Sequence, residues 1–218
     1  MRRLGFAPLR PRPRHRQADP EAQEAFKKKL FLMVFWLKPR FPWLQLEVWA
    51  FDEHRLGLKP IRRRVWAPRG QTPLARERPR YRWLYVYAFV RPGTGESEYW
   101  PLPSVSTEAF NLVLSSFARM RGAGEGKLVL LVLDRAGWHT SRQVQVPEGV
   151  GLCFLPPYSP ELQPVERTWG LMDGVVANGQ VEDEEALWSK VEARCAYLQT
   201  QPALIQGYTL FHWWPGGC

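Results

Sequence analysis

The sequence contains little cysteine. Its three cysteines, Cys153, Cys195 and Cys218, are an odd number, are widely spaced and form no C-x-x-C pair. This pattern argues against a disulfide framework and against a zinc knuckle, and it fits a reducing, intracellular compartment. A chain of 218 residues can bury one sizeable core, so we expect one globular domain.

Long hydrophobic runs are also absent. The longest, Leu30 to Leu37, is far shorter than the roughly 20 residues that a membrane-spanning helix needs. The arginine-rich start of the chain has no apolar segment ending in small residues, so no secretory signal is visible. We therefore expect no membrane span and a cytoplasmic protein.

Acidic residues are outnumbered: 21 Asp and Glu stand against 30 Lys and Arg, which gives a formal net charge of +9. Such a balance spreads a positive field over the surface and makes nucleic acid the leading class of partner. Charge by itself does not decide the question, because many basic proteins never touch DNA.

The hydrophobic pattern predicts an α/β domain with a mixed sheet. We expect strands over 44–53, 81–90, 99–102, 128–133 and 150–155. We expect helices over 19–36, from a Thr107 cap to Gly122, from Pro164 through Glu166, Trp169 and Asp173, and after an Asp183 cap. The predicted organisation is a basic Arg/Pro-rich tail or linker (1–20), a bridging helix and connection (21–43), a catalytic domain (44–200) and a C-terminal tail (201–218).

Two carboxylates sit at the ends of buried-type strands, and a third lies near the start of a helix: Asp52, Asp134 and Glu166. Strand ends at a sheet edge are where reactive groups of α/β folds collect. Hard divalent cations such as Mg²⁺ and Mn²⁺ prefer oxygen ligands of this kind, and a pair of them can promote in-line displacement at a phosphodiester. Each acid taken alone has a simpler explanation: Asp52 as an ordinary strand-terminal acid, Asp134 as a turn or cap residue, and Glu166 as an acid near a helix start.

Four ordered segments carry a resemblance to a known family. They are Asp52-Glu53 after an aromatic strand, the stretch 66–73 (WAPRGQTP), Leu133-Asp134 with His139, and the long stretch 155–169 (LPPYSPELQPVERTW). Together they resemble the mariner-related bacterial insertion-sequence transposases of the DDE superfamily over roughly residues 44–175, and the last segment is the most specific.

The resemblance implies a ribonuclease H-like fold that brings Asp52 and Asp134 on adjacent strands to Glu166 on a following helix. These three residues would be catalytic and would bind Mg²⁺ or Mn²⁺, as two ions. The implied activity is DNA cleavage and strand transfer in DNA transposition, by a homodimer acting on transposon ends and target DNA. The implied location is the bacterial nucleoid.

Several residues are secondary candidates. The predicted DNA-binding residues are Arg62, Arg63, Arg64, Arg69, His139 and Arg167. For the arginines a solvated basic surface is an equal alternative, and His139 is at least as easily explained as an ordinary histidine. Glu161 and Asp173 remain alternative third acids, although the family motif favours Glu166.

The sequence departs from the family at three points. Arg135 replaces the common asparagine after the second aspartate and is expected to compete for Asp134, and Gln163 replaces the asparagine before Pro164. No helix-turn-helix module is expected ahead of Pro20, which suggests a truncated copy or a separately encoded recognition partner. Two alternatives therefore stay open: a catalytically silent DNA-binding remnant, and a ribonuclease H-like nuclease without joining activity.

Overall fold

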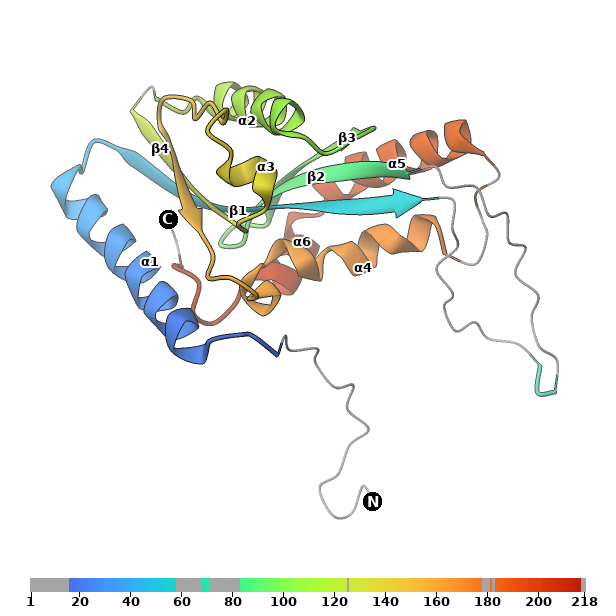
Figure 1. Ribbon diagram of the computed structural model, residues 1–218, viewed down its shortest axis with the longest axis horizontal. Helices are drawn as coiled ribbons and strands as arrows, with labels where there is room; N and C mark the ends of the chain where they lie inside the picture. Colours follow the sequence, from blue (N-terminus) through green and yellow to red (C-terminus); the bar gives the residue numbers. More distant parts are fainter. Residues whose placement is uncertain are drawn as a thin grey trace, which may run out of the picture.

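A five-stranded sheet forms the centre of the computed structural model, which describes residues 16–57, 68–70, 83–124, 126–177, 181 and 183–216. The strands are β1 (Gln45–Gly57), β2 (Trp83–Arg91), β3 (Glu96–Leu102), β4 (Lys127–Leu133) and β5 (Val150–Phe154). Their order across the sheet is β3-β2-β1-β4-β5 (Figure 1). β1 pairs antiparallel with β2 and parallel with β4, which confirms the predicted mixed sheet.

The alternation of side chains along β1 divides the core into two clusters. Val48 and Ala50 point into one cluster, while Trp49 and Phe51 point into the other. A period of two follows from the pleat of a strand, so Asp52 continues the first face and Glu53 the second. This confirms the prediction that the strand delivers Asp52 and Glu53 to opposite sides of the sheet.

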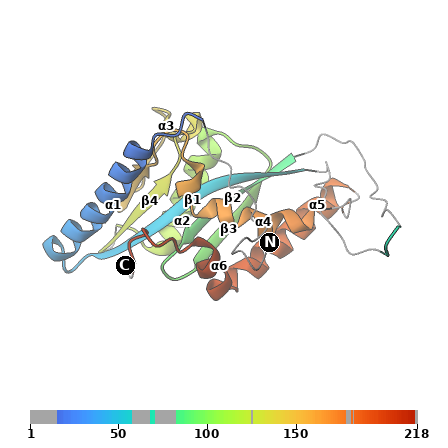
Figure 2. The same cartoon turned by 90° about the horizontal axis from the view of Figure 1, so that it is seen from below.

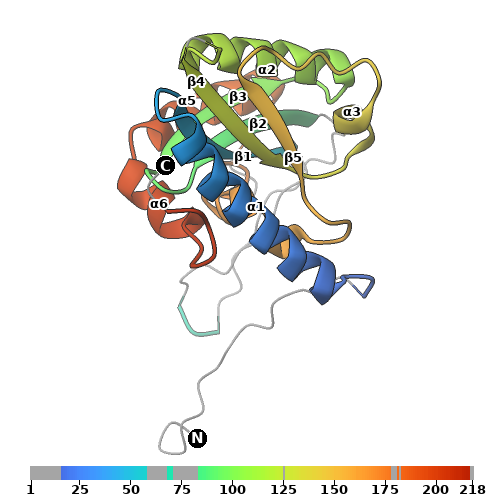
Figure 3. The same cartoon turned by 90° about the vertical axis from the view of Figure 1, so that its left-hand side faces the viewer.

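Helices cover both faces of the sheet. α1 (Pro20–Arg40), α5 (Glu184–Gln199) and α6 (Pro202–Thr209) contribute buried residues to the cluster that contains Val48. α2 (Thr107–Arg121) covers the opposite face, with α3 (Gly137–Thr140) beside it (Figures 1 and 3). Seen from below, α4 (Trp169–Met172), α5 and α6 lie across the strands (Figure 2).

The helix ends largely follow the sequence. Asp19 caps α1 and Asp183 caps α5, each through a side-chain oxygen that accepts from backbone N–H groups of the first turn. Gly122 ends α2 in the left-handed conformation, with φ of 65°. The cap of α2 is Ser106 rather than the predicted Thr107, whose hydroxyl donates to Trp138 O instead.

Two segments differ from expectation. The helix predicted through Glu166, Trp169 and Asp173 is a series of short turns: η3 (Val165–Arg167), α4 and η4 (Asp173–Val175). Thr168 Oγ1 donates to Val165 O at 2.7 Å, which competes with regular helical bonding, and Gly170 and Gly174 lower the helix propensity. Residues 201–218, predicted to be a tail, contain α6, and both Ile205 and Trp214 are buried in the core.

Among the helices that the structure describes, none combines the length and the apolar character needed to cross a membrane.

Candidate active site

Asp52 lies in the second half of β1, on the face of the sheet that α4 covers. Its Oδ2 accepts a hydrogen bond from Trp169 Nε1 at 3.0 Å. Burial, followed by the negative charges of Glu166 and Glu53, raises the pKa of Asp52 well above its usual range, although the bond from Trp169 acts in the opposite direction. The environment therefore favours a proton or a cation at this carboxylate.

Asp134 directly follows β4, the parallel neighbour of β1. Ala50 pairs with Val132 in this register, so positions 52 and 134 emerge side by side two residues further along. Asp134 Oδ1 accepts bonds from Ala136 N at 3.0 Å and from His139 Nδ1 at 2.7 Å. Burial opposes ionisation of Asp134, but the two hydrogen bonds and the charge of His139 outweigh it and lower its pKa.

Glu166 comes from the opposite side of the pocket, on the 3-10 turn η3. Burial of its carboxyl raises the pKa of Glu166; the nearby His54 counteracts this effect, and the charge of Asp134 adds to it. Two of the three acids thus have raised pKa values, mainly because burial disfavours their charged forms and secondarily because other acids lie nearby.

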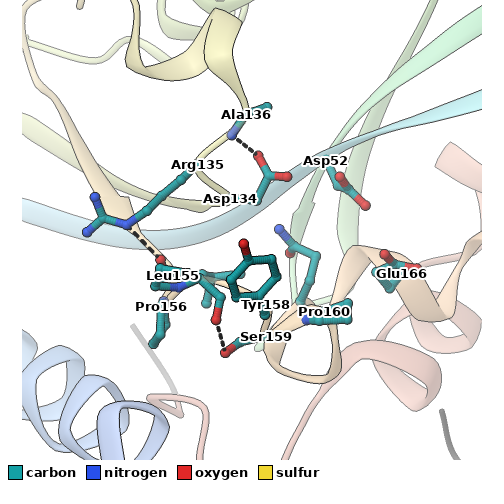
Figure 4. Close-up of a pocket in the computed structure, with 12 residues that line it drawn as sticks. Asp52, Asp134, Arg135, Ala136, Leu155, Pro156, Tyr158, Ser159, Pro160 and Glu166 are labelled. Carbon is teal, nitrogen blue, oxygen red and sulfur yellow. Dashed lines mark hydrogen bonds between the residues drawn. The ribbon is translucent and has the colours of Figure 1, made fainter. Parts of the chain in front are cut away.

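The three carboxylates line one pocket of about 420 Å³ (Figure 4). Its remaining wall is made by Arg135, Ala136, Gln163 and the loop 155–160. As placed, no group of three or more His, Cys, Asp or Glu side chains in the described ranges has the arrangement of a metal site. The acids are therefore gathered around one cavity without standing at ligand distance from a common point.

The proline-rich loop 155–160 is fixed from several sides. Gln23 of α1 donates to Ser159 Oγ at 3.0 Å, and Gln163 Nε2 donates to Phe51 O at 2.7 Å. Tyr158 adopts a positive φ of 56°, a conformation that costs energy for a residue with a side chain. The departure at Gln163 thus has a structural role, since its amide ties the loop to β1 next to Asp52.

Both alternative third acids are engaged elsewhere. Asp173 Oδ1 lies 2.7 Å from His54 Nε2, and Glu161 Oε1 accepts from Gln23 Nε2 at 2.8 Å. The described lining of the pocket includes neither. Arg135 does not reach for Asp134 either: its Nε donates to Leu155 O at 3.1 Å (Figure 4), and its guanidinium lies over Phe154.

The predicted DNA-binding residues fall into three groups. Arg62, Arg63 and Arg64 lie outside the described residues. Arg69 and Arg167 are exposed, and the guanidinium of Arg167 lies 5.2 Å from the ring centre of Phe211. His139 is 1% exposed and both of its ring nitrogens face protein carboxylates, which leaves neither for a phosphate.

Sequence reasoning assigned no role to Glu53 and His54, two residues that hold the site together. Glu53 Oε1 lies 2.9 Å from His139 Nε2, and His54 stacks on Trp169 with ring centres 4.8 Å apart. These contacts join segments more than 80 residues apart, so spacing along the chain does not indicate them. The one available signal was an acid and a histidine directly following Asp52 on a strand otherwise buried.

Comparison with known proteins identifies the class to which this fold and site belong. Residues 47–197 match the family described as DDE superfamily endonuclease. The chain belongs to this family. An uncharacterized protein of Sinorhizobium fredii (strain NBRC 101917 / NGR234), y4pE/y4sA, is 35% identical over 132 residues, which are 60% of this chain and 96% of that protein.

Solved structures share the fold at low sequence identity. The Mos1 strand transfer complex superposes with a TM-score of 0.56 at 16% identity, over 94% of this chain and 64% of that one. The Mos1 transposase catalytic domain, solved with raltegravir and Mn, gives a TM-score of 0.51 at 15% identity, over 89% and 94%. The expected ribonuclease H-like fold is confirmed, and the chain spans about two thirds of the length of the Mos1 chain in the strand transfer complex.

Residues 1–30 match a second family, described as winged helix-turn-helix. Residues 1–15 lie outside the described residues, and residues 20–30 form the first half of α1. The stretch predicted to be only a basic tail or linker, residues 1–20, thus lies within this match.

Proposed function

We propose that this chain carries the catalytic domain of a DNA transposase, which cleaves a phosphodiester bond and joins the new 3′-hydroxyl end to a second DNA. The observation that carries the proposal is the gathering of Asp52, Asp134 and Glu166 around one pocket in a chain of the DDE superfamily endonuclease family. These acids come from β1, the end of β4 and η3, so the fold itself brings them together.

The donor set suits divalent cations, Mg²⁺ or Mn²⁺, which Asp52, Asp134 and Glu166 would hold. Carboxylate oxygens are the ligands that these hard ions prefer. Burial, with a smaller contribution from neighbouring acids, raises the pKa of Asp52 and Glu166, and a bound cation would offset the cost of their buried negative charge. Two bound ions would supply activation of a water or 3′-hydroxyl and stabilisation of the leaving oxygen. The Mos1 catalytic domain was itself solved with Mn.

The residues of the chain orient this site. Trp169 Nε1 fixes Asp52 Oδ2, while Ala136 N and His139 Nδ1 hold Asp134 Oδ1. The loop 155–160 closes one side of the pocket and limits the path by which DNA would enter. Arg69 and Arg167, both exposed, are proposed phosphate contacts.

The proposed partners are transposon-end and target DNA, bound by a homodimer. The net charge of +9 supports DNA as the partner, and the Mos1 relative was solved as a strand transfer complex. Recognition of specific ends would fall to a winged helix-turn-helix module that residues 1–30 resemble, or to a separately encoded partner.

The proposal predicts metal-dependent nicking of supercoiled plasmid by the purified chain in Mg²⁺ or Mn²⁺. Asp134→Ala and Glu166→Ala should each reduce nicking by at least about 100-fold, because each removes a carboxylate that stabilises the transition state through the metal. Gel separation of supercoiled, open-circular and linear DNA measures the rate.

Glu161→Gln is the matched control, since Glu161 is an acid on the same segment that bonds to Gln23. It should keep at least half of the parental rate. Nicking that survives in both alanine variants would refute the assigned site, and DNA binding without nicking under any divalent ion would point to a silent remnant. An oligonucleotide strand-joining assay separates a transposase from a plain nuclease.

A further inference from the structure

Behind Asp134 a chain of hydrogen bonds runs through the core to the far face of β1. Asp134 Oδ1 lies 2.7 Å from His139 Nδ1, and His139 Nε2 lies 2.9 Å from Glu53 Oε1. Trp138 Nε1 donates to the same Glu53 oxygen at 3.2 Å. Each ring nitrogen of His139 therefore faces a carboxylate, an arrangement in which both nitrogens donate.

The hydrogen-bonded series from Asp134 through His139 to Glu53 is buried at His139 and Glu53, so its charged groups cost free energy that a purely stabilising role does not explain. The side chains of Glu53 and His139 are 6% and 0% exposed, and the ring of His139 lies against Phe51 and Phe110. A buried ion pair stabilises a fold less well than apolar residues of similar volume usually do. The presence of this pair among packed aromatic rings is therefore poorly explained by stability, and its contact with Asp134 supplies another role.

Asp134 needs an external support because its side chain is 53% exposed and begins beyond the end of β4. Both of its hydrogen bonds, from His139 and from Ala136 N, go to Oδ1. The other carboxylate oxygen lies on the side of Asp52 (Figure 4). Holding Oδ1 thus aims Oδ2 at the pocket.

We propose that Glu53 is a positioning residue, which acts through His139 to fix the orientation of Asp134 for metal binding. The inference rests on the proposed function, because it assumes that Asp134 is a metal ligand. Neighbouring residues of β1 then serve the same site from opposite faces: Asp52 enters the pocket, and Glu53 holds the second aspartate from behind. The register of β1 with β4 brings the two aspartates side by side, and the imidazole ring of His139 links Asp134 to Glu53.

The test compares Mn²⁺ binding by the full chain and by Glu53→Ala, Glu53→Gln and His139→Asn, with free Mn²⁺ measured by electron paramagnetic resonance. Partners that orient metal ligands typically contribute 10- to 100-fold in affinity. We expect Glu53→Ala and His139→Asn to weaken Mn²⁺ binding about 10- to 100-fold. We expect Glu53→Gln to be intermediate, because an amide oxygen still accepts from Trp138 and His139. The Mg²⁺ concentration for half-maximal nicking should rise by the same factor, with much of the maximal rate restored at saturating metal.

Glu47→Gln is the matched control for the loss of a buried carboxylate on the same strand. Glu47 is also buried on β1 and also accepts an indole N–H, from Trp49 at 2.8 Å, but it pairs with Arg91 and Lys127 instead of a site residue. The Glu47→Gln variant should have a lower melting temperature than the parent. Its Mn²⁺ affinity should be unchanged at a temperature where the variant is folded. Unchanged Mn²⁺ affinity in folded Glu53 variants, or an equal loss in Glu47→Gln, overturns the positioning role.

Different results would refute the proposed function and the positioning role of Glu53. If the parental chain neither binds Mn²⁺ nor nicks DNA, the proposed function is wrong, and the role of Glu53 falls with it. If the parental chain does both, Asp134→Ala does neither, and the folded Glu53 variants behave as the parent does, the positioning role alone is wrong.

Discussion

Asp52 carries its carboxylate where the fold by itself disfavours a negative charge. Burial and the neighbouring acids Glu166 and Glu53 raise its pKa, so the folded protein binds a proton at this position more tightly than the unfolded chain does. Folding stability linked to Asp52 is therefore fully present below the unfolded pKa of about 3.9 and is lost as the pH rises through the raised pKa of the folded state. Above the raised pKa of the folded state the metal-free protein bears this penalty in full.

Asp52→Asn should consequently stabilise the metal-free protein at neutral pH while abolishing nicking. The amide oxygen can still accept from Trp169 Nε1, and the repulsion from Glu166 disappears. We expect a rise in melting temperature of roughly 2–4 °C, the shift that about 1 kcal/mol produces in a domain of this size. Calorimetry in EDTA at several pH values measures it, and the advantage should vanish near pH 4. A lower melting temperature at neutral pH would contradict the idea that the fold destabilises the ionised form of Asp52.

The candidate site was predictable at residue level only in part. Asp52 and Asp134 follow from strand ends and family motifs, and the register of β1 with β4 explains why they emerge side by side. Glu53 was placed correctly on the opposite face, but its partner His139 is 86 positions away. A contact of that kind depends on how α3 packs against β1, which a local pattern does not encode.

At the scale of elements, α2 is joined to β3 by a charged cluster on the outer edge of the sheet. Arg121, in the last turn of α2, bonds to Glu96 and Glu98 of β3, and its guanidinium lies 4.4 Å from the ring centre of Trp49. The Arg121 side chain is 18% exposed, so water screens these pairs only partly. One arginine thus connects three elements of the core.

Arg121→Met should destabilise the fold without touching the chemistry of the pocket. It keeps an apolar stem but leaves Glu98, 12% exposed, without this cation, a loss of about 1–3 kcal/mol in the free energy of unfolding. Urea unfolding followed by tryptophan fluorescence measures the change. Arg119→Met, an exposed arginine in the same turn, should change stability by less than about 0.5 kcal/mol. Equal effects of the two substitutions would show that the cluster contributes nothing specific.

Elements with a strong period were predicted better than those shaped by tertiary contacts. Helix α2 and strand β4 match their predicted ranges to within a residue or two. The apolar residues of α2 recur with the helical period of about 3.6 residues, and β4 is a continuous apolar run. The segment after Pro164 was expected as one helix, yet Thr168 and two glycines divide it into short turns. Helix α6 was not predicted, because it has only eight residues and buries only Ile205 and Thr209, too few positions to show a helical period in the sequence.

For the whole molecule, the charge distribution assigns DNA binding and catalysis to different residues. The chain has a net charge of +9, but the pocket gathers three carboxylates on a surface that would receive the phosphates of DNA under the proposed function. Basic residues elsewhere would supply the attraction, and the acids would oppose it until a cation is bound. Metal-free DNA binding should therefore weaken as the salt concentration rises, and it should not require the catalytic carboxylates.

Asp134→Asn tests this separation in EDTA. The variant should bind duplex DNA at least as tightly as the parent, since it removes one negative charge beside the proposed DNA path, while it nicks no plasmid when Mg²⁺ is restored. For both proteins a fourfold increase in KCl should weaken binding at least about tenfold, which corresponds to roughly two phosphate contacts. Fluorescence anisotropy of a labelled duplex measures both effects. Binding that is lost with Asp134, or that ignores salt, would place the main DNA contacts in the pocket and not in the positive field of the whole chain.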